Sequence, residues 1–469
     1  MNADDSRAGL NMVETGPPAI TVTQSSSTIL PQEDQLAVAP VRSEERITAI
    51  DTIRGFALLG ILLMNICSFG LPQAAYNNPS PAGGATGPNL ITWFIVTVLG
   101  EGKMRAIFSM TFGASVYLLI DRLSRKGAAA DAADIHYRRM LWLLLFGMIH
   151  AYLIWDGDIL FPYAMMGLLL YPLRKISPKA LLITAGIMML CIAGSGLGYH
   201  YHLMKQHREY NVVQADEKAG KKLTKDQEET KKDWEQTVTD FTPSADDLKK
   251  ETEAHLGGYL KLLAFRAKAV YRIHGYPIYV PPVWFDMLDM MLIGIALLKL
   301  ELLTGKYSNK FYLWMAVISF MIGLPAHTWS VWWAAKQHFS IESMTLTFAV
   351  YEFGRFTAFG YIAVLLVLMK SGVLRAATKT LGAVGQMAFS NYILTSLICT
   401  TIFEGYGFAL FGKLQRYQLY GIVLAVWLVI LVVSPMWLCQ FRFGPLEWAW
   451  RSLTYWKKQP FRLRDRALG

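Results

Sequence analysis

The chain has 469 residues, of which 53% are hydrophobic and only 17% are charged, whereas charged residues usually make up about 25% of a soluble domain. Its apolar runs are roughly 17–25 residues long, the length that crosses a hydrocarbon core of about 30 Å, and one soluble core could not bury all of them. The net charge of +10 comes from Lys and Arg beside these runs, so it indicates the positive-inside rule and not a nucleic-acid partner.

Residues 1–45 are rich in Ser, Thr, Pro, Asp and Glu and lack the basic start and apolar core of a signal peptide. This composition predicts a disordered tail. The remainder predicts an all-α polytopic integral membrane protein with about ten membrane-spanning helices, and the stretch 90–100 is interpreted as an interfacial or re-entrant helix that leads into the second span. The predicted spans are 50–70, 103–121, 138–154, 159–173, 180–199, 281–299, 311–332, 346–369, 382–402 and 418–440.

Lys and Arg are concentrated in alternate loops, which places those loops in the cytoplasm. We therefore expect both termini in the cytoplasm. The rich segments are 121–139, 174–179, 299–310, 370–379 and the C-terminal tail, and the poor ones are 72–89, 155–158 and 333–345.

This orientation divides the chain into five segments. The highly charged insert at 204–257 is interpreted as a solvated helical hairpin or a flexible insert, with a lid or a partner-binding element as the alternative. The segments are a cytoplasmic tail (1–45), a transmembrane bundle with the candidate active site (46–203), the extracytoplasmic insert (204–257), a second transmembrane bundle (258–441) and a basic cytoplasmic tail (442–469).

The four cysteines, Cys67, Cys191, Cys399 and Cys439, all lie in apolar runs and show no C-x-x-C spacing. They are interpreted as small hydrophobic residues, not as a disulfide framework or metal ligands.

Charged residues inside predicted spans are costly, about 2.5–3.5 kcal/mol each on insertion scales, and therefore mark functional candidates. Asp51 and Arg54 share a helix face in the first span and can form an ion pair. That pair either fixes the cytoplasmic end of the helix or binds an anionic cytosolic ligand. Asn65 lies deeper in the same span, as a polar contact inside the bundle.

The second cluster precedes the second span directly. Glycines at 100 and 102 allow a sharp turn, after which Lys103 begins a helix that places Arg105 and Ser109 on one face. We interpret these charges as functional; the alternative is an ordinary solvated loop.

The third cluster lies at the outer end of the third span. His150 is followed by Asp156 and Asp158, with Gly157 between the two carboxylates. A carboxylate that orients an imidazole is an arrangement suited to a general base. The structural alternative is a packed histidine beside a tight turn. No metal is expected, because no H-x-x-x-H spacing occurs.

The fourth cluster comprises polar residues of the later spans. Glu352 and Arg355 share a face and can neutralise each other, whereas Asp286 and Asp289 need a partner from another helix, for which Arg105 and Lys103 are candidates. With Asn391, these side chains are predicted to line one internal cavity.

Several motifs together resemble the YeiB-like family of bacterial inner-membrane proteins, which is defined by a C-terminal domain of unknown function. The resemblance covers nearly the whole chain after residue 45. The motifs are Arg46-x4-Asp51-x2-Arg54-Gly55, Lys103-x-Arg105-x2-Phe108-Ser109, His150-x5-Asp156-Gly157-Asp158, Gln386-Met387-Ala388-x2-Asn391-Tyr392 and Phe443-Gly444-Pro445-Leu446-Glu447-Trp448.

The first spans of this family are similar to the transmembrane acyltransferases, which move an acyl group from cytosolic acyl-CoA to an acceptor across the membrane by means of a histidine in a membrane cavity. The resemblance implies acyl-CoA as co-substrate and matches Asp51 and Arg54 to the opening motif. In the N-acetyltransferases of this group the histidine precedes the second span, where 72–102 of this chain contains no histidine. His150 is therefore the candidate.

The leading hypothesis is an acyltransferase in which Arg54, Arg138 and Arg139, with Asp51, hold the CoA phosphates. His150 acts as general base, oriented by Asp156 or Asp158. The acceptor is an unidentified glycan, lipid or small molecule, and the oligomeric state is left open. The alternatives are a small-solute or proton-coupled transporter and a non-catalytic membrane scaffold. The predicted substrate-binding residues are Asn65, Lys103, Arg105, Ser109, Asp286 and Asn391.

Overall fold

The computed structural model describes residues 47–125, 129–279 and 282–463, all of which belong to one compact unit. These residues form helices and turns without a β-strand, so the prediction of an all-α protein is confirmed for them. The predicted tail at 1–45 and the last residues of the C-terminal tail, 464–469, lie outside the described residues.

Membrane-spanning helices are the dominant element. Six helices or helix pairs among the described residues are long and apolar enough to cross a bilayer. They are Thr48–Gly70, Gly87–Arg125, Pro178–Lys218, Asn309–Lys336, Ile341–Ser371 and Arg416–Leu438. The other four predicted spans, 138–154, 159–173, 281–299 and 382–402, coincide with shorter or less apolar helices.

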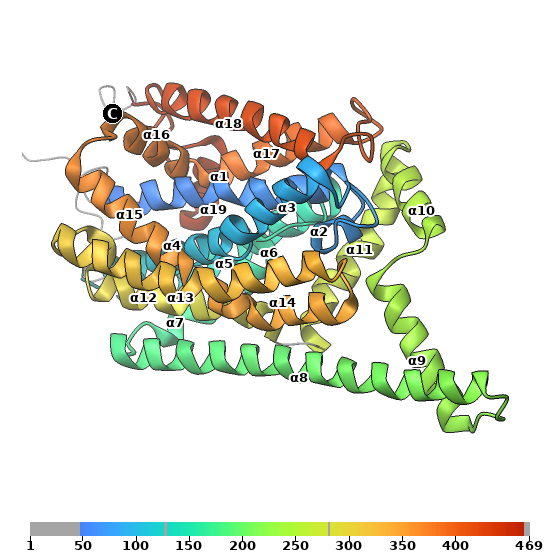
Figure 1. Ribbon diagram of the computed structural model, residues 1–469. Coiled ribbons are helices and arrows are strands. Elements are labelled where there is room, and N and C mark those ends of the chain that lie inside the picture. The colour runs from blue at the N-terminus through green and yellow to red at the C-terminus, as the bar shows by residue number, and fades with distance from the viewer. Residues whose placement is uncertain (1–46, 126–128, 280–281, 464–469) are drawn as a thin grey trace, which may run out of the picture. The chain divides into compact units, whose positions relative to one another are not determined.

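The helices follow one another as Figure 1 shows. Their bounds are α1 Thr48–Gly70, α2 Ala74–Asn77, α3 Gly87–Gly100, α4 Lys103–Arg125, α5 Ala129–Ile149, the π-helical turn η3 His150–Ile154, α6 Leu160–Leu168, α7 Leu170–Leu173, α8 Pro178–Lys218, α9 Lys225–Phe241, α10 Ala245–His255, α11 Tyr259–Tyr279, α12 Pro282–Lys299, η4 Leu302–Thr304, α13 Asn309–Lys336, α14 Ile341–Gly354, α15 Thr357–Ser371, α16 Arg375–Gln386, α17 Ala388–Phe403, α18 Arg416–Leu438 and α19 Pro445–Tyr455.

Two faces of the helix bundle are distinguished below. The N-terminal face is the one at which α1, α8 and α13 begin and α18 ends, on the left of Figure 1, and the opposite face is the one at which α1 ends and α10 lies.

The junction between α3 and α4 interrupts the apolar helical stretch Gly87–Arg125. Gly102 adopts a left-handed backbone conformation with a φ of 75°, which glycine adopts without steric cost. A Cβ atom there would also lie 2.6 Å from the ring of Tyr351. The break at Glu101 and Gly102 therefore separates α3 from α4 and lets Arg105 face the bundle interior.

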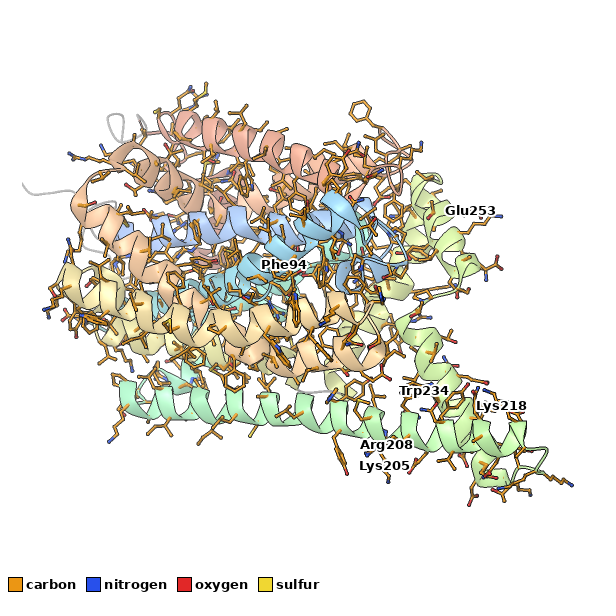
Figure 2. All side chains as sticks on the ribbon, viewed as in Figure 1. Phe94, Lys205, Arg208, Lys218, Trp234 and Glu253 are labelled. Atoms are coloured by element: carbon orange, nitrogen blue, oxygen red, sulfur yellow. The ribbon has the colours of Figure 1, made fainter. Side chains whose placement is uncertain are left out.

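The charged insert continues the helix before it. α8 extends through the predicted boundary at residue 204 to Lys218, and α9 returns along it with the Trp234 ring stacked on the His207 ring at a centroid distance of 4.5 Å. Figure 2 shows Trp234 on α9 beside the charged end of α8. Thr224 and Gln227 form a capping box at the start of α9. The end of α8 and α9 therefore form a helical hairpin.

Glycines allow two pairs of helices to approach closely. A Cβ atom at Gly385 on α16 would lie 1.9 Å from the Asp51 carbonyl oxygen on α1, and one at Gly294 on α12 would lie 1.9 Å from the Met110 carbonyl oxygen on α4. Small residues at such crossings are the usual means by which membrane helices gain van der Waals contact. These contacts hold α1, α4, α12 and α16 together around the polar residues described below.

Replacing Gly294 by Val should destabilise the protein, because the side chain would collide with α4. Overpacking of this kind costs about 1–3 kcal/mol. Thermal unfolding in detergent should show a lower transition temperature for Gly294→Val. Gly186→Val is the matched control, because a Cβ atom at Gly186 on α8 meets nothing within 4 Å. Equal stability of the two variants would contradict the close packing of α4 and α12.

Candidate functional site

A cavity of about 190 Å³ opens toward the N-terminal face. We call it the N-side cavity. Its polar lining comes from α1, α4, α5, α16 and α19, and most of the remaining wall is aliphatic or aromatic. The polar residues are Asp51, Arg54, Ser115, Arg139, Gln386, Glu447 and Arg451. The wall farthest from the N-terminal face is formed by Ile159, Leu160, Tyr163 and Tyr392.

Two arginines are held in place at this cavity. Arg54 pairs with Asp51 at 2.9 Å, donates to the Gly385 carbonyl at 3.4 Å and also bonds Ser115. The Arg139 guanidinium lies over the Trp450 ring, 4.0 Å from its centroid, which is a cation–π contact. Both cations line the cavity and remain oriented without an incoming ligand.

Three of the four residues predicted to bind the acyl donor therefore come together, namely Asp51, Arg54 and Arg139. Arg138 does not join them. It pairs with Asp134 one helical turn away and lies 5.8 Å from the centroid of the Trp456 ring.

Glu447 connects the C-terminal segment to this cavity. Its carboxylate accepts hydrogen bonds from the backbone N–H groups of Phe389, at 2.7 Å, and Ser390, at 3.1 Å, and from the Ser390 hydroxyl. These N–H groups are unsatisfied donors at the start of α17, where an acidic group is favourable. Burial raises the pKa of the Glu447 carboxyl. Glu447 lies in the motif that closes the resemblance, but its capping role was not predicted.

His150 lies beyond the far wall of the N-side cavity and makes two hydrogen bonds. Its Nδ1 is 2.7 Å from Asp158 Oδ1, and its Nε2 is 2.9 Å from Ser396 Oγ. The second carboxylate oxygen of Asp158 accepts the Phe161 backbone N–H at 2.7 Å. His150 and Ser396 are each 1% exposed, so the arrangement is a buried serine–histidine–aspartate chain.

Local backbone geometry positions the histidine. His150 opens η3, a single π-helical turn at the end of α5, and such turns often occur at functional sites. Of the two carboxylates predicted to orient the imidazole, Asp158 does so. Asp156 instead lies near Glu251 and acts electrostatically on the Glu251 carboxyl group.

Tyr392 separates the N-side cavity from this chain of hydrogen bonds. It lines the cavity, its ring centroid is 5.0 Å from that of His150, and its hydroxyl accepts the Ile159 backbone N–H at 3.2 Å. The histidine is therefore one side chain away from the cavity.

A second cavity, of about 310 Å³, lies on the side of the opposite face. We call it the opposite cavity. Its polar lining consists of Asn65, Tyr76, Glu101 and Arg105, and Ile159 forms part of its wall as well. A further space of about 230 Å³ shares Tyr76, Glu101 and Arg105 with it. Because Ile159 lines both the N-side and the opposite cavity, the two approach each other at this residue, which follows Asp158 in the chain.

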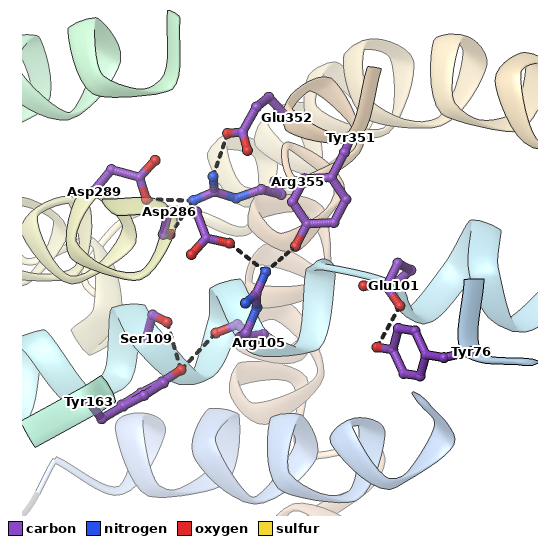
Figure 3. A network of polar contacts seen from close by, with 10 residues as sticks. All are labelled: Tyr76, Glu101, Arg105, Ser109, Tyr163, Asp286, Asp289, Tyr351, Glu352 and Arg355. Atoms are coloured by element: carbon purple, nitrogen blue, oxygen red, sulfur yellow. Dashed lines mark hydrogen bonds and ion pairs between the residues drawn. The ribbon is translucent and has the colours of Figure 1, made fainter. Parts of the chain in front are cut away.

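Ion pairs between helices support the opposite cavity (Figure 3). Arg105 pairs with Asp286 and donates to the Tyr351 hydroxyl at 2.6 Å. Arg355 pairs with Glu352 and with Asp289, the latter at 2.5 Å. The prediction that Asp286 needs a partner such as Arg105 is confirmed, as is the Glu352–Arg355 pair. The partner of Asp289 is Arg355 and not Lys103.

The remaining predicted residues support the helices and do not line the cavities. Lys103 is buried, with its Nζ 3.4 Å from the Thr97 carbonyl oxygen. Ser109 Oγ is 2.7 Å from the Tyr163 hydroxyl, behind the N-side cavity. Asn391 donates to the Val384 carbonyl at 3.1 Å and to Ser434 at 2.9 Å, which ties α17 to α16 and α18.

Ser396 is the residue that sequence reasoning missed. It follows Tyr392 by four positions on α17 and thus lies on the same helix face. That spacing was the available signal, but a serine in an apolar helix commonly bonds only its own backbone.

The chain is similar to proteins whose names state no activity. Residues 297–457 match the family model "Protein of unknown function (DUF418)". "Uncharacterized protein YeiB" of Escherichia coli (strain K12) is 32% identical over 418 residues, which cover 87% of this chain and 96% of that protein. "Uncharacterized protein YxaH" of Bacillus subtilis (strain 168) is 30% identical over 444 residues, which cover 90% and 98%. No solved structure matches.

Removing Arg355 should destabilise the protein strongly, because Asp289 and Glu352 would remain buried without their cation. Breaking one partner out of a buried pair costs about 3–5 kcal/mol. Thermal unfolding in detergent should therefore show a large loss for Arg355→Met and a smaller loss for Arg355→Met combined with Asp289→Asn.

The matched control for Arg355→Met is Lys306→Met, which removes the cation of the exposed Lys306–Glu301 pair and should cost at most about 1 kcal/mol. A loss for Arg355→Met no greater than that of Lys306→Met would show that the buried network does not stabilise the fold.

Proposed function

This chain belongs to the YeiB-like family, and we propose that it is a membrane-bound acyltransferase that moves an acyl group from cytosolic acyl-CoA to an acceptor on the outer side of the membrane. The observation that carries the proposal is the pair of cavities that meet at Ile159, beside a histidine already aligned by a carboxylate. A donor and an acceptor that approach from different sides need such a meeting point.

The proposal includes a membrane topology. Ten spans with both termini in the cytoplasm place the N-terminal face inside and the insert outside. The alternation of Lys- and Arg-rich loops supports this orientation, and a helix lies at each of the ten positions. The relatives come from bacteria and six helices of the described residues are long and apolar enough to cross a bilayer, which supports a location in the bacterial plasma membrane.

The N-side cavity is the donor site of the proposal. Arg54 and Arg139 are the groups that bind the CoA phosphates, because guanidinium groups form strong charge-assisted hydrogen bonds with phosphate. The apolar walls, which include Phe108, Phe112 and Leu143, accommodate the acyl chain as it extends toward Tyr392.

His150 is the general base of the proposal. Because the Asp158 carboxylate accepts the Nδ1 proton, Nε2 is left with a lone pair that can take a proton. The acceptor occupies the opposite cavity, where Asn65, Glu101 and Arg105 offer hydrogen bonds. This lining suits a hydroxyl or amine of a glycan, a lipid or a small molecule.

A transporter is the second candidate, because two cavities separated by a thin wall are also compatible with alternating access, and the buried ion pairs are of a kind found along transport paths. Solute flux into liposomes in the absence of acyl-CoA would favour the transporter.

Replacing His150 by Gln should abolish acyl transfer while the protein still folds. General base catalysis contributes roughly 10²–10⁴-fold, so the rate of acyl-CoA consumption by membranes that contain the acceptor should fall by about that factor. His136→Gln is the matched control, since His136 is a second buried histidine, located on α5. Unchanged transfer in His150→Gln would remove this histidine from the mechanism.

Replacing Arg139 by Ala should raise the KM for acyl-CoA with little effect on kcat. The loss of a hydrogen bond to a charged group, about 1.5–3 kcal/mol, corresponds to roughly a 10–100-fold change. Arg138→Ala is the matched control, because Arg138 pairs with Asp134 outside the N-side cavity. Equal effects of the two variants would contradict the assignment of the donor site.

A further inference from the structure

Ser396 is the third member of the hydrogen-bonded chain that contains His150 and Asp158. Resting on the proposed function, we propose that Ser396 is a covalent relay: its hydroxyl takes the acyl group from acyl-CoA as an ester and then passes it to the acceptor.

The geometry is that of an activated serine. Ser396 Oγ is 2.9 Å from His150 Nε2, and His150 Nδ1 is 2.7 Å from Asp158 Oδ1. A nucleophilic serine requires a base within about 2.6–3.2 Å and a third group that orients the base. Asp158 is itself fixed by the Phe161 backbone N–H at 2.7 Å. All three roles are therefore filled, by residues from η3, the turn before α6, and α17.

The direction of the hydrogen bonds agrees with this role. Because Asp158 accepts the proton on Nδ1, Nε2 is an acceptor and the Ser396 hydroxyl is the donor. That hydroxyl has a second acceptor, the Tyr392 carbonyl oxygen, but at the longer distance of 3.2 Å. A serine that served only to satisfy its own helix would not need a histidine at the shorter distance.

Access to Ser396 requires one movement. Ser396 and His150 are each 1% exposed, and Tyr392 lies between them and the N-side cavity, with its hydroxyl held by the Ile159 N–H. Rotation of the Tyr392 side chain breaks that single bond and opens the serine to the acyl chain. The closed state excludes water, which protects an acyl ester from hydrolysis.

The chemistry balances in two steps. The Ser396 oxygen attacks the thioester carbonyl carbon, its proton passes to His150 Nε2, and the carbon–sulfur bond breaks; the CoA thiolate takes the proton back from the imidazolium and leaves as the thiol. A hydroxyl or amine of the acceptor then attacks the ester carbonyl carbon and loses its proton to His150. The bond between the acyl carbon and the Ser396 oxygen breaks, and that oxygen leaves with the proton from the imidazolium, which restores the serine hydroxyl.

A relay explains why two cavities meet without merging. Ile159 forms part of both walls, so donor and acceptor are kept apart and need not be bound together. Transfer through an acyl-enzyme should show ping-pong kinetics, whereas direct transfer requires both substrates at once.

The test uses the purified full-length protein in detergent and two reagents. A fluorophosphonate probe reports an activated serine without an acyl donor. Radiolabelled acetyl-, octanoyl- and palmitoyl-CoA, added separately and quenched with acid, report the acyl-enzyme, and peptide mass spectrometry identifies the labelled residue. We expect both kinds of reagent to label Ser396, with labelling lost in Ser396→Ala and at least 100-fold slower in His150→Gln.

Two variants make the result specific. Thr395→Ala is the matched control, because the neighbouring Thr395 hydroxyl bonds only the Asn391 carbonyl of its own helix, at 2.8 Å, among the described residues, and its labelling should be unchanged. Ser396→Cys should convert the acyl ester into a thioester that neutral hydroxylamine cleaves.

The outcomes separate the relay from the proposed function. Acyl transfer that persists in Ser396→Ala but is lost in His150→Gln overturns the relay and leaves the acyltransferase intact. Fluorophosphonate labelling of Ser396 without label from any of the three acyl-CoA donors overturns the relay, because an acyltransferase that transfers directly forms no acyl-enzyme. If neither reagent labels Ser396 in the natural protein or in Tyr392→Ala, whose smaller side chain widens the access, the assignment of Ser396 as a nucleophile is wrong.

Discussion

A polar side chain in the interior of a bilayer must find its partner within the protein, because no water is available to solvate it. This constraint shapes the bundle. Asp289 pairs with Arg355, Asp286 with Arg105, and Asp158 with His150. Each pair joins different elements: α12 to the α14–α15 junction, α12 to α4, and the turn before α6 to η3. The glycine contacts between α1 and α16 and between α4 and α12 bring the helices close enough for these pairs to form.

The same pairings give the two cavities different characters. The N-side cavity has cations at one end and an apolar wall at the other, whereas the opposite cavity has Arg105 fixed by Asp286 and Tyr351. Under the proposed function, the network around Arg355 supports the acceptor site without taking part in the reaction, and the His150 chain is the set of polar groups that transfers the proton. Structure and chemistry thus depend on one requirement, the pairing of buried polar groups.

The sequence predicted the elements better than the contacts between them. Apolar run length and charge identified a helix at each predicted span, and helical spacing identified the Asp51–Arg54 and Glu352–Arg355 pairs, because these interactions are local. The need of Asp286 for Arg105 followed from the cost of an unpaired charge. Contacts between distant segments were harder to predict. Ser396 was missed because nothing near it in the chain indicates that α17 packs against η3. Arg138 and Arg139 were indistinguishable by sequence, since only the rotation of α5 decides which one faces the cavity.

The central claim is that the N-side cavity receives an acyl-CoA whose reactive end lies beside Ile159 and Tyr392. Cryo-electron microscopy of the full chain with a non-hydrolysable thioether analogue of acetyl-CoA tests it most directly. The account predicts density in the N-side cavity, with the phosphates at Arg54 and Arg139 and the thioether sulfur at the wall formed by Ile159 and Tyr392. An empty N-side cavity under saturating analogue, or phosphates bound instead in the opposite cavity at Arg105, would contradict the account.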